Sequence, residues 1–206
     1  MGATGLLYVG AVLFMNGCSL LGWVKGKAHA PMDLFVGILQ VITPLYLIFT
    51  AHGDTAQILG ASGLFLFGFT YLYVAMNEFF NLDGTGLGWF CFYVVLAALV
   101  YSYFNFRDAN ASGCVFGVLW LSWAYLWWLF WMVLSMGKAA WARYTGAVCA
   151  TQGIITGFVP ALILLGEPSY FTTSLAIGIA VAGAVLDTIY IFTVKRGQEE
   201  VASTAH

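Results

Sequence analysis

An uncharged run at residues 115–132 constrains the fold of this chain more than any other feature. It reads VFGVLWLSWAYLWWLFWM and holds five of the eight tryptophans of the chain. The hydrocarbon core of a bilayer is ~30 Å thick and takes ~20 helical residues, so this run is long enough to cross a membrane as one helix. On that helix a single stripe contains Trp120, Trp123, Trp127 and Trp131, and Trp128 lies off it.

The tryptophan stripe has two interpretations. Tryptophan usually lies at the membrane–water interface, where its N–H stays hydrated, and a stripe that runs through the span departs from that habit. The stripe can pack against neighbouring helices, with its end members as interfacial anchors. Alternatively it can form one wall of a pore for a small, planar, neutral solute. Spacing alone favours packing, because aromatic stripes at helical spacing are most often core.

Composition identifies an integral membrane protein. The chain is 62% hydrophobic and 8% charged, whereas soluble domains carry about 25% charged residues. The net charge is −2 and no basic tract is present, which argues against a nucleic-acid partner. The His, Cys, Asp and Glu residues show no metal-binding, redox or catalytic spacing. We therefore expect no metal, no cofactor and no enzymatic activity.

Seven apolar segments predict an all-α membrane protein, a bundle of seven transmembrane helices. Pro160 inside the sixth segment predicts a kink. Residues 1–194 are expected to form a single transmembrane domain, and residues 195–206 a short charged tail. The segments cover residues 4–24, 32–50, 58–80, 89–106, 115–132, 142–165 and 172–194.

The basic residues predict the orientation of the bundle. If the N-terminus is outside and the chain changes sides at each segment, six of the seven Lys and Arg residues fall on the inside, and Arg107 is left outside. Excess Lys and Arg mark the cytoplasmic side, so the C-terminus is predicted to be cytoplasmic. The six inside residues are Lys25, Lys27, Lys138, Arg143, Lys195 and Arg196.

Ionisable side chains are scarce within the segments. Asp33 falls at the start of the second segment, where an acid suits the positive end of a helix dipole. Asp187 lies deep in the seventh, where it is either a functional acid or a packing acid kept hydrogen-bonded or protonated. Neutral polar residues are more frequent, and they either tie helices together or line a path for a neutral polar solute. They are Asn16, Gln40, Thr70, Asn77, Asn105, Gln152 and Thr156.

Two short patterns concern contacts between helices. Residues 68–73, GFTYLY, match residues 122–127, SWAYLW, position for position in size and aromatic character. The third and fifth segments therefore present similar aromatic faces. Small residues four apart allow close backbone approach, and such pairs predict helix contacts at Gly113 and Gly117, Gly153 and Gly157, and Gly178 and Ala182.

Four stretches carry recognisable motifs. They are LLYVG at residues 6–10 followed by Leu13 and Asn16-Gly17, LFGFTYLY at 66–73 followed by Ala75 and Asn77, LWLSWAYLW at 119–127, and the run from Gln152-Gly153 to Pro160. The two stretches in the third and fifth segments are the most specific. Over about residues 1–165 these stretches resemble the AmiS/UreI family of bacterial urea and short-chain amide channels.

The resemblance implies a passive channel for urea or short-chain amides in the bacterial inner membrane, with six core helices and a seventh at the C-terminus. It also implies a homohexamer that encloses lipid, with a pore through each protomer. Aliphatic and aromatic constrictions would flank the middle of that pore. The residues carried over as pore-lining are Leu6, Val9, Leu13, Phe69, Tyr73, Trp120, Trp123 and Trp127, and Gln152 stands where acid-gated members carry a glutamate.

Three hypotheses follow. The first is a passive channel without acid gating, because Gln152 replaces that glutamate and the loop at residues 51–57 is short with one histidine. The second is a proton-coupled amide transporter with Asp187 as the coupling residue. The third is an accessory membrane subunit in which the tryptophan face only packs. The tryptophan stripe, the match between residues 68–73 and 122–127, and the family motifs together favour the passive channel.

Overall fold

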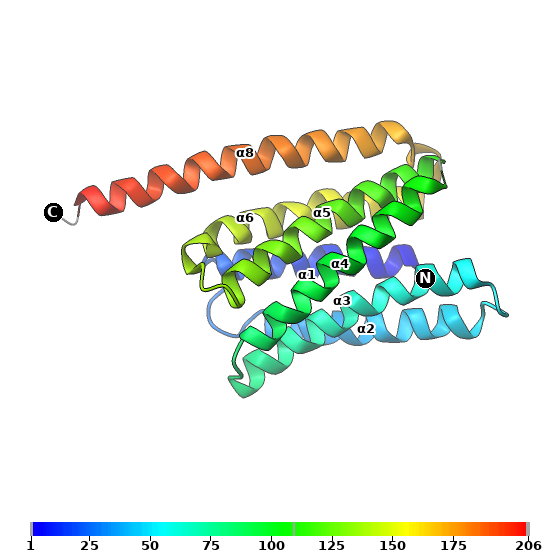
Figure 1. Ribbon diagram of the computed structural model, residues 1–206, viewed down its shortest axis with the longest axis horizontal. Coiled ribbons are helices and arrows are strands. Elements are labelled where there is room, and N and C mark those ends of the chain that lie inside the picture. Colours follow the sequence, from blue (N-terminus) through cyan, green and yellow to red (C-terminus); the bar gives the residue numbers. More distant parts are fainter. Residues whose placement is uncertain (1, 109, 205–206) are drawn as a thin grey trace.

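The computed structural model describes residues 2–108 and 110–204, with side chains to residue 193, and these ranges contain helices but no strand (Figure 1). The helices are α1 (Gly2–Leu20), α2 (Ala30–Phe49), α3 (Thr55–Phe80), α4 (Thr85–Arg107), α5 (Ala111–Leu134), α6 (Ala142–Gln152), α7 (Val159–Gly166) and α8 (Thr173–Thr204). Short 3-10 turns η1 (Ala139–Trp141) and η3 (Pro168–Tyr170) and a π-helix η2 (Gly153–Phe158) complete the list.

Seven helical spans in the described chain are long and apolar enough to cross a membrane, which confirms the predicted number. The sixth span is composite, because η1, α6, η2 and α7 follow one another without a break over Ala139–Gly166. Local chemistry sets the ends of the helices. The Asp54 side chain accepts hydrogen bonds from the first N–H groups of α3, and Asn110 does the same for α5. Asn81 ends α3 with φ of 52°.

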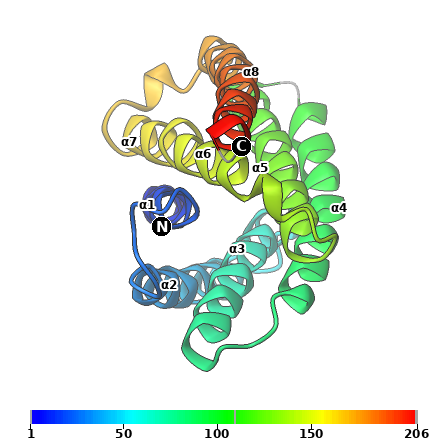
Figure 2. The same ribbon diagram turned by 90° about the vertical axis from the view of Figure 1, so that its left-hand side faces the viewer.

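The spans before α8 form a ring when the bundle is viewed along its axis (Figure 2). The most extensive contacts join α4 with α5, α2 with α3, and α1 with α6. Each of the first two pairs is an antiparallel hairpin with a short loop, whereas α1 reaches the sixth span across the sequence. The ring therefore brings α1, α3 and α5, which carry the family motifs, around one interior.

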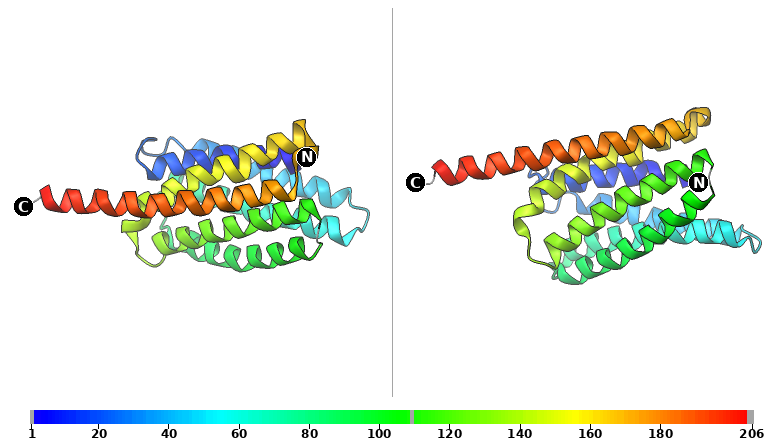
Figure 3. Two further views of the ribbon diagram at one scale, coloured as in Figure 1. Left: turned by 90° about the horizontal axis from the view of Figure 1, so that it is seen from above. Right: turned by 45° about the horizontal axis from the view of Figure 1, so that its top comes forward.

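Helix α8 lies outside this ring, against α5 and α6 (Figure 3). Only 11% of the most apolar stretch of α8 is buried, against 56% of the corresponding stretch of α5. The Thr151 and Tyr190 hydroxyls, 2.7 Å apart, form one hydrogen bond between α6 and α8. Helix α8 continues to Thr204, so it includes the charged residues that follow position 194.

Close backbone packing joins α1 to the sixth span. A Cβ atom at Gly10 would lie 2.6 Å from the Phe158 nitrogen and 2.7 Å from the Gly153 oxygen. The predicted contact at Gly153 and Gly157 is therefore confirmed, with α1 as the partner. The prediction for Gly178 is wrong within this chain, because no atom lies within 4 Å of the place a Cβ would take. The π-helix η2 ends just before Pro160, a residue that cannot donate a backbone hydrogen bond.

Candidate solute pathway

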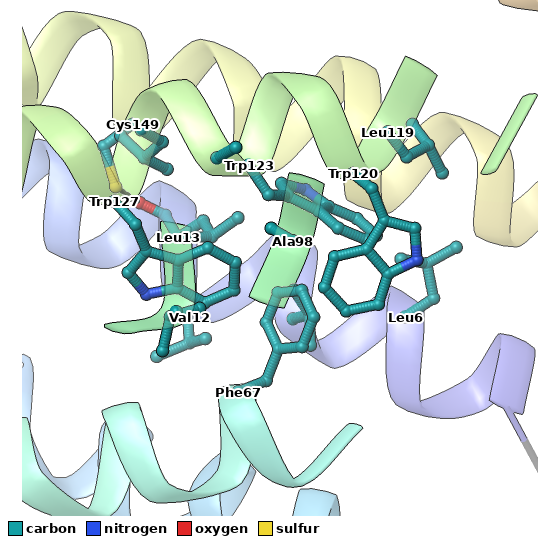
Figure 4. Packing of buried hydrophobic residues seen from close by; sticks show 14 of the residues in the cluster. Leu6, Val12, Leu13, Phe67, Ala98, Leu119, Trp120, Trp123, Trp127 and Cys149 are labelled. Carbon is teal, nitrogen blue, oxygen red and sulfur yellow. Dashed lines mark hydrogen bonds between the residues drawn. The ribbon is translucent and has the colours of Figure 1, made fainter. Parts of the chain in front are cut away.

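Three members of the tryptophan stripe of α5, namely Trp120, Trp123 and Trp127, face the interior of the ring and converge on Phe67 of α3 (Figure 4). The ring centroid of Phe67 lies 5.7 Å from that of Trp120 and 4.8 Å from those of Trp123 and Trp127. These four side chains are 3–6% exposed. Aromatic pairs at such distances attract one another beyond simple area burial, so Phe67 and the stripe form a cohesive contact across the ring.

Two pockets lie on either side of this contact, and Phe67 and Trp123 line both of them. The first, called here the Gln40 pocket, has a volume of about 290 Å³ and lies towards the start of α1. The second, called the Asn16 pocket, has a volume of about 370 Å³ and lies towards the end of α1. The two pockets thus follow α1 in series, with the Phe67–Trp123 contact between them.

Most of the predicted pore residues line these pockets. The Gln40 pocket contains Leu6, Val9 and Trp120, the Asn16 pocket contains Leu13 and Trp127, and both contain Trp123. The walls are therefore aliphatic on α1 and aromatic on α3 and α5. Such walls suit a flat solute with little charge.

Phe69 and Tyr73 were also predicted to line the pore, but they line neither pocket. Phe69 is 50% exposed and stacks on Phe65, with centroids 5.5 Å apart. At 3.6 residues per turn, Phe69 points about 200° away from Phe67. Tyr71 points about 40° from Phe67 and lines the Asn16 pocket. In this structure Phe67 and Tyr71 are therefore the aromatic side chains of the α3 motif region that line the pockets.

The orientation of Trp123 depends on the π-helix. Its indole Nε1–H donates to the Thr156 hydroxyl over 3.0 Å, and that hydroxyl donates to the Gln152 carbonyl over 2.6 Å. An indole has one N–H donor, at the edge of the ring. Because this bond uses that edge, the two faces of the ring remain available to the pathway. Gln152, predicted to line the pore, is 5% exposed and lines neither pocket. Its main chain instead supports the Trp123 bond.

Two neutral polar residues of α1 and α2, Asn16 and Gln40, both tie the helices together and line the pockets. Gln40 donates from Nε2 to the Gly5 carbonyl over 3.0 Å, which ties α2 to α1, and it also lines its pocket. Asn16 donates from Nδ2 to the Asp33 carboxylate over 2.7 Å and also lines its pocket. Asp33 is completely buried. The helix-dipole interpretation of Asp33 thus missed its main contact, which spans two helices.

The remaining members of the tryptophan segment pack away from the pathway. Trp128 stacks on Tyr125 with centroids 6.0 Å apart, and Trp131 contacts Trp89 at 5.7 Å. Asp187 is half-buried on α8 and lines neither pocket. Among the described residues, no group of three His, Cys, Asp or Glu side chains is placed to hold a metal ion.

Comparison with known proteins identifies the family of this fold and motif set. The profile of AmiS/UreI family transporters matches residues 1–167, which end just before α8. The chain belongs to the AmiS/UreI family. Family members are channels and transporters rather than enzymes, and they are membrane proteins of urea and amide transport.

Two relatives and one solved structure show the extent of the similarity. A candidate transporter protein, AmiS2, of Rhodococcus erythropolis is 47% identical over 187 residues, which are 90% of this chain and 88% of that protein. The acid-activated urea channel of Helicobacter pylori is 32% identical over 185 residues, 77% of this chain and 94% of the relative. The cryo-EM structure of the H. pylori urea channel in the closed state has a TM-score of 0.73 at 29% identity, covering 80% of this chain and 97% of that one.

Proposed function

We propose that this AmiS/UreI protein is a passive channel for urea or short-chain amides. The observation that carries the proposal is the series of two pockets separated by the contact of Phe67 with Trp123. A structural tryptophan face would need no pockets on both sides of it. The name of one relative, an acid-activated urea channel, supports the same class of solute.

The walls favour small neutral solutes over ions. Urea and simple amides are planar, so they can pass between the flat faces of aromatic side chains. A hydrated ion would have to lose water where aromatic and aliphatic walls offer little in exchange, and hydrophobic constrictions exclude ions in this way. Selectivity therefore needs no ring of charged side chains.

Proton coupling is the alternative that the transporter names of some relatives keep open. Asp187 is poorly placed for that role, because it lies on the peripheral helix α8 and outside both pockets. Asp33 adjoins the pathway through Asn16, so it is the better candidate for a coupling acid. Asp33→Asn in proteoliposomes separates the two mechanisms: a coupled transporter loses uptake against a gradient, whereas a channel shows none before or after the change.

The proposed setting is the bacterial inner membrane, with the N-terminus outside, the C-terminus in the cytoplasm and a homohexamer as the assembly. The six-to-one distribution of Lys and Arg supports this orientation, and the family resemblance supports the hexamer. Residues 1–194 act as one channel domain in this proposal.

Stopped-flow permeation through proteoliposomes tests the function directly. Urea and acetamide should equilibrate faster than in protein-free vesicles, and glycerol, which is not planar, should gain less. Equal rates in protein-containing and protein-free vesicles would refute the channel. The accessory-subunit hypothesis predicts that result, so the same experiment decides between the two.

A further inference from the structure

The Asn16 pocket gathers polar atoms that have no partner in the described part of the chain. Across the described residues, eight buried side-chain nitrogen or oxygen atoms lack a hydrogen bond. Three of them, Asn16 Oδ1, Tyr71 Oη and Asn77 Oδ1, belong to residues that line this pocket. A fourth, Asp33 Oδ2, belongs to the residue bonded to Asn16. Buried polar groups are nearly always paired, so this concentration points to a partner that enters the pocket.

Asn16 has a fixed orientation. Its amide nitrogen donates to the Asp33 side chain over 2.7 Å, and an ionised carboxylate accepts hydrogen bonds but cannot donate them. While Asp33 is ionised, the Asn16 amide therefore cannot exchange its nitrogen and oxygen without losing that bond. Its oxygen is kept as a hydrogen-bond acceptor at the pocket wall, and Asn16 itself is 8% exposed.

Asn77 complements this fixed acceptor. It comes from α3, lines the same pocket, and its side chain makes no hydrogen bond to another described residue. A free amide can offer either its N–H groups or its oxygen. The pocket thus holds one fixed acceptor and one group that can donate, which matches the adjacent N–H and C=O groups of a primary amide or of urea.

We infer that the Asn16 pocket is a binding site for the amide group of the solute. The Asn16 oxygen accepts a solute N–H, Asn77 contacts the solute carbonyl, and Asp33 acts as a positioning residue that holds Asn16. The inference rests on the proposed function, since it assigns a recognition step to that pathway. Because the Asn16 oxygen is buried in this conformation, the contact forms as the solute enters.

Permeation of two solutes of comparable size tests the site. Acetamide carries N–H donors, whereas dimethyl sulfoxide only accepts hydrogen bonds. The test variant combines Asn16→Leu with Asp33→Leu, so that neither partner of the bond is left unpaired. Thr145→Val is the matched control, because Thr145 is also buried with an unpartnered hydroxyl but lines neither pocket.

The double variant should lower acetamide permeability about two- to tenfold, the effect of losing one hydrogen bond, and leave dimethyl sulfoxide unchanged. Asp33→Asn should lower acetamide permeability less, and Thr145→Val should change neither solute. An unchanged ratio of the two permeabilities, or an equal fall in both, overturns the inference. Wild-type protein that passes no acetamide would instead overturn the proposed function itself.

A second measurement uses the unmodified protein, in case the double variant does not fold. A structure of the wild-type protein with selenourea, a urea analogue with a heavy atom, locates the solute directly. Selenourea in contact with Asn16 and Asn77 supports the site. Selenourea bound elsewhere in the pathway, with this pocket unoccupied, overturns it.

Discussion

Phe67 meets Trp123 edge to face, with ring centroids 4.8 Å apart and ring planes at 86°. The two residues come from α3 and α5, and together they separate the Gln40 pocket from the Asn16 pocket. In the proposed channel, a solute that crosses the bundle along α1 has to part these rings. The contact would then be a barrier whose height depends on two side chains.

Removing one ring should lower that barrier. An aromatic pair contributes about 0.5–1.5 kcal/mol beyond area burial, so Phe67→Ala should raise urea and acetamide permeability about two- to tenfold. It should also admit glycerol, because the passage becomes wider. Stopped-flow permeation measures all three solutes. Phe69→Ala, on the outer face of the same helix, is the control, and equal effects of the two changes would contradict this role for Phe67.

The Trp123–Thr156 hydrogen bond should matter for stability and for selectivity. Thr156→Val leaves the buried indole N–H without an acceptor, which costs about 1–3 kcal/mol, and it frees the ring to turn. We expect a lower Tm in detergent and a changed ratio of urea to acetamide permeability. Thr151→Val, one turn away, loses only a bond to the peripheral helix α8 and is the comparison. Wild-type values of both quantities in Thr156→Val would show that the bond is dispensable.

Transport should depend little on external pH between 5 and 8. The loop between α2 and α3 carries one histidine, His52, which is exposed. At the other end of the bundle, hydrogen bonds from the Thr85 hydroxyl and backbone N–H lower the pKa of the Asp83 carboxyl. A lowered pKa keeps Asp83 ionised throughout this range, so it contributes no titration there.

The measurement is urea flux into proteoliposomes at pH 5 and pH 8. A severalfold higher flux at pH 5 would contradict the prediction. His52→Ala then shows whether that histidine is the cause.

Gly10→Ala should disrupt the bundle. The added methyl group would overlap the backbone of η2, with 2.6 Å to the Phe158 nitrogen, and backbone cannot move aside as a flexible side chain can. Overpacking of this kind typically costs about 1–3 kcal/mol. We expect a lower Tm and loss of urea flux. Gly178→Ala meets no atom within 4 Å and should leave both unchanged; an equal loss in the two variants would refute the packing argument.

Sequence reasoning succeeded where the physical signal was local. The seven apolar segments and the tryptophan stripe each follow from composition and spacing within one segment. Phe67 was not among the residues carried over from the family resemblance, and an aromatic-rich helix that is apolar all round does not reveal which face is inward. The link from Asn16 to Asp33 was missed for another reason. It joins residues 17 positions apart on different helices, and only the fold brings them together.

The two pockets in series have a kinetic consequence. In the proposed channel, solutes cannot pass one another at the contact of Phe67 with Trp123, so each protomer would conduct them in single file. A molecule that waits in one pocket delays any other that arrives from the opposite side. At a fixed concentration difference, net flux should therefore stop increasing as the solute concentration on both faces rises. Urea and acetamide should compete for the same pathway.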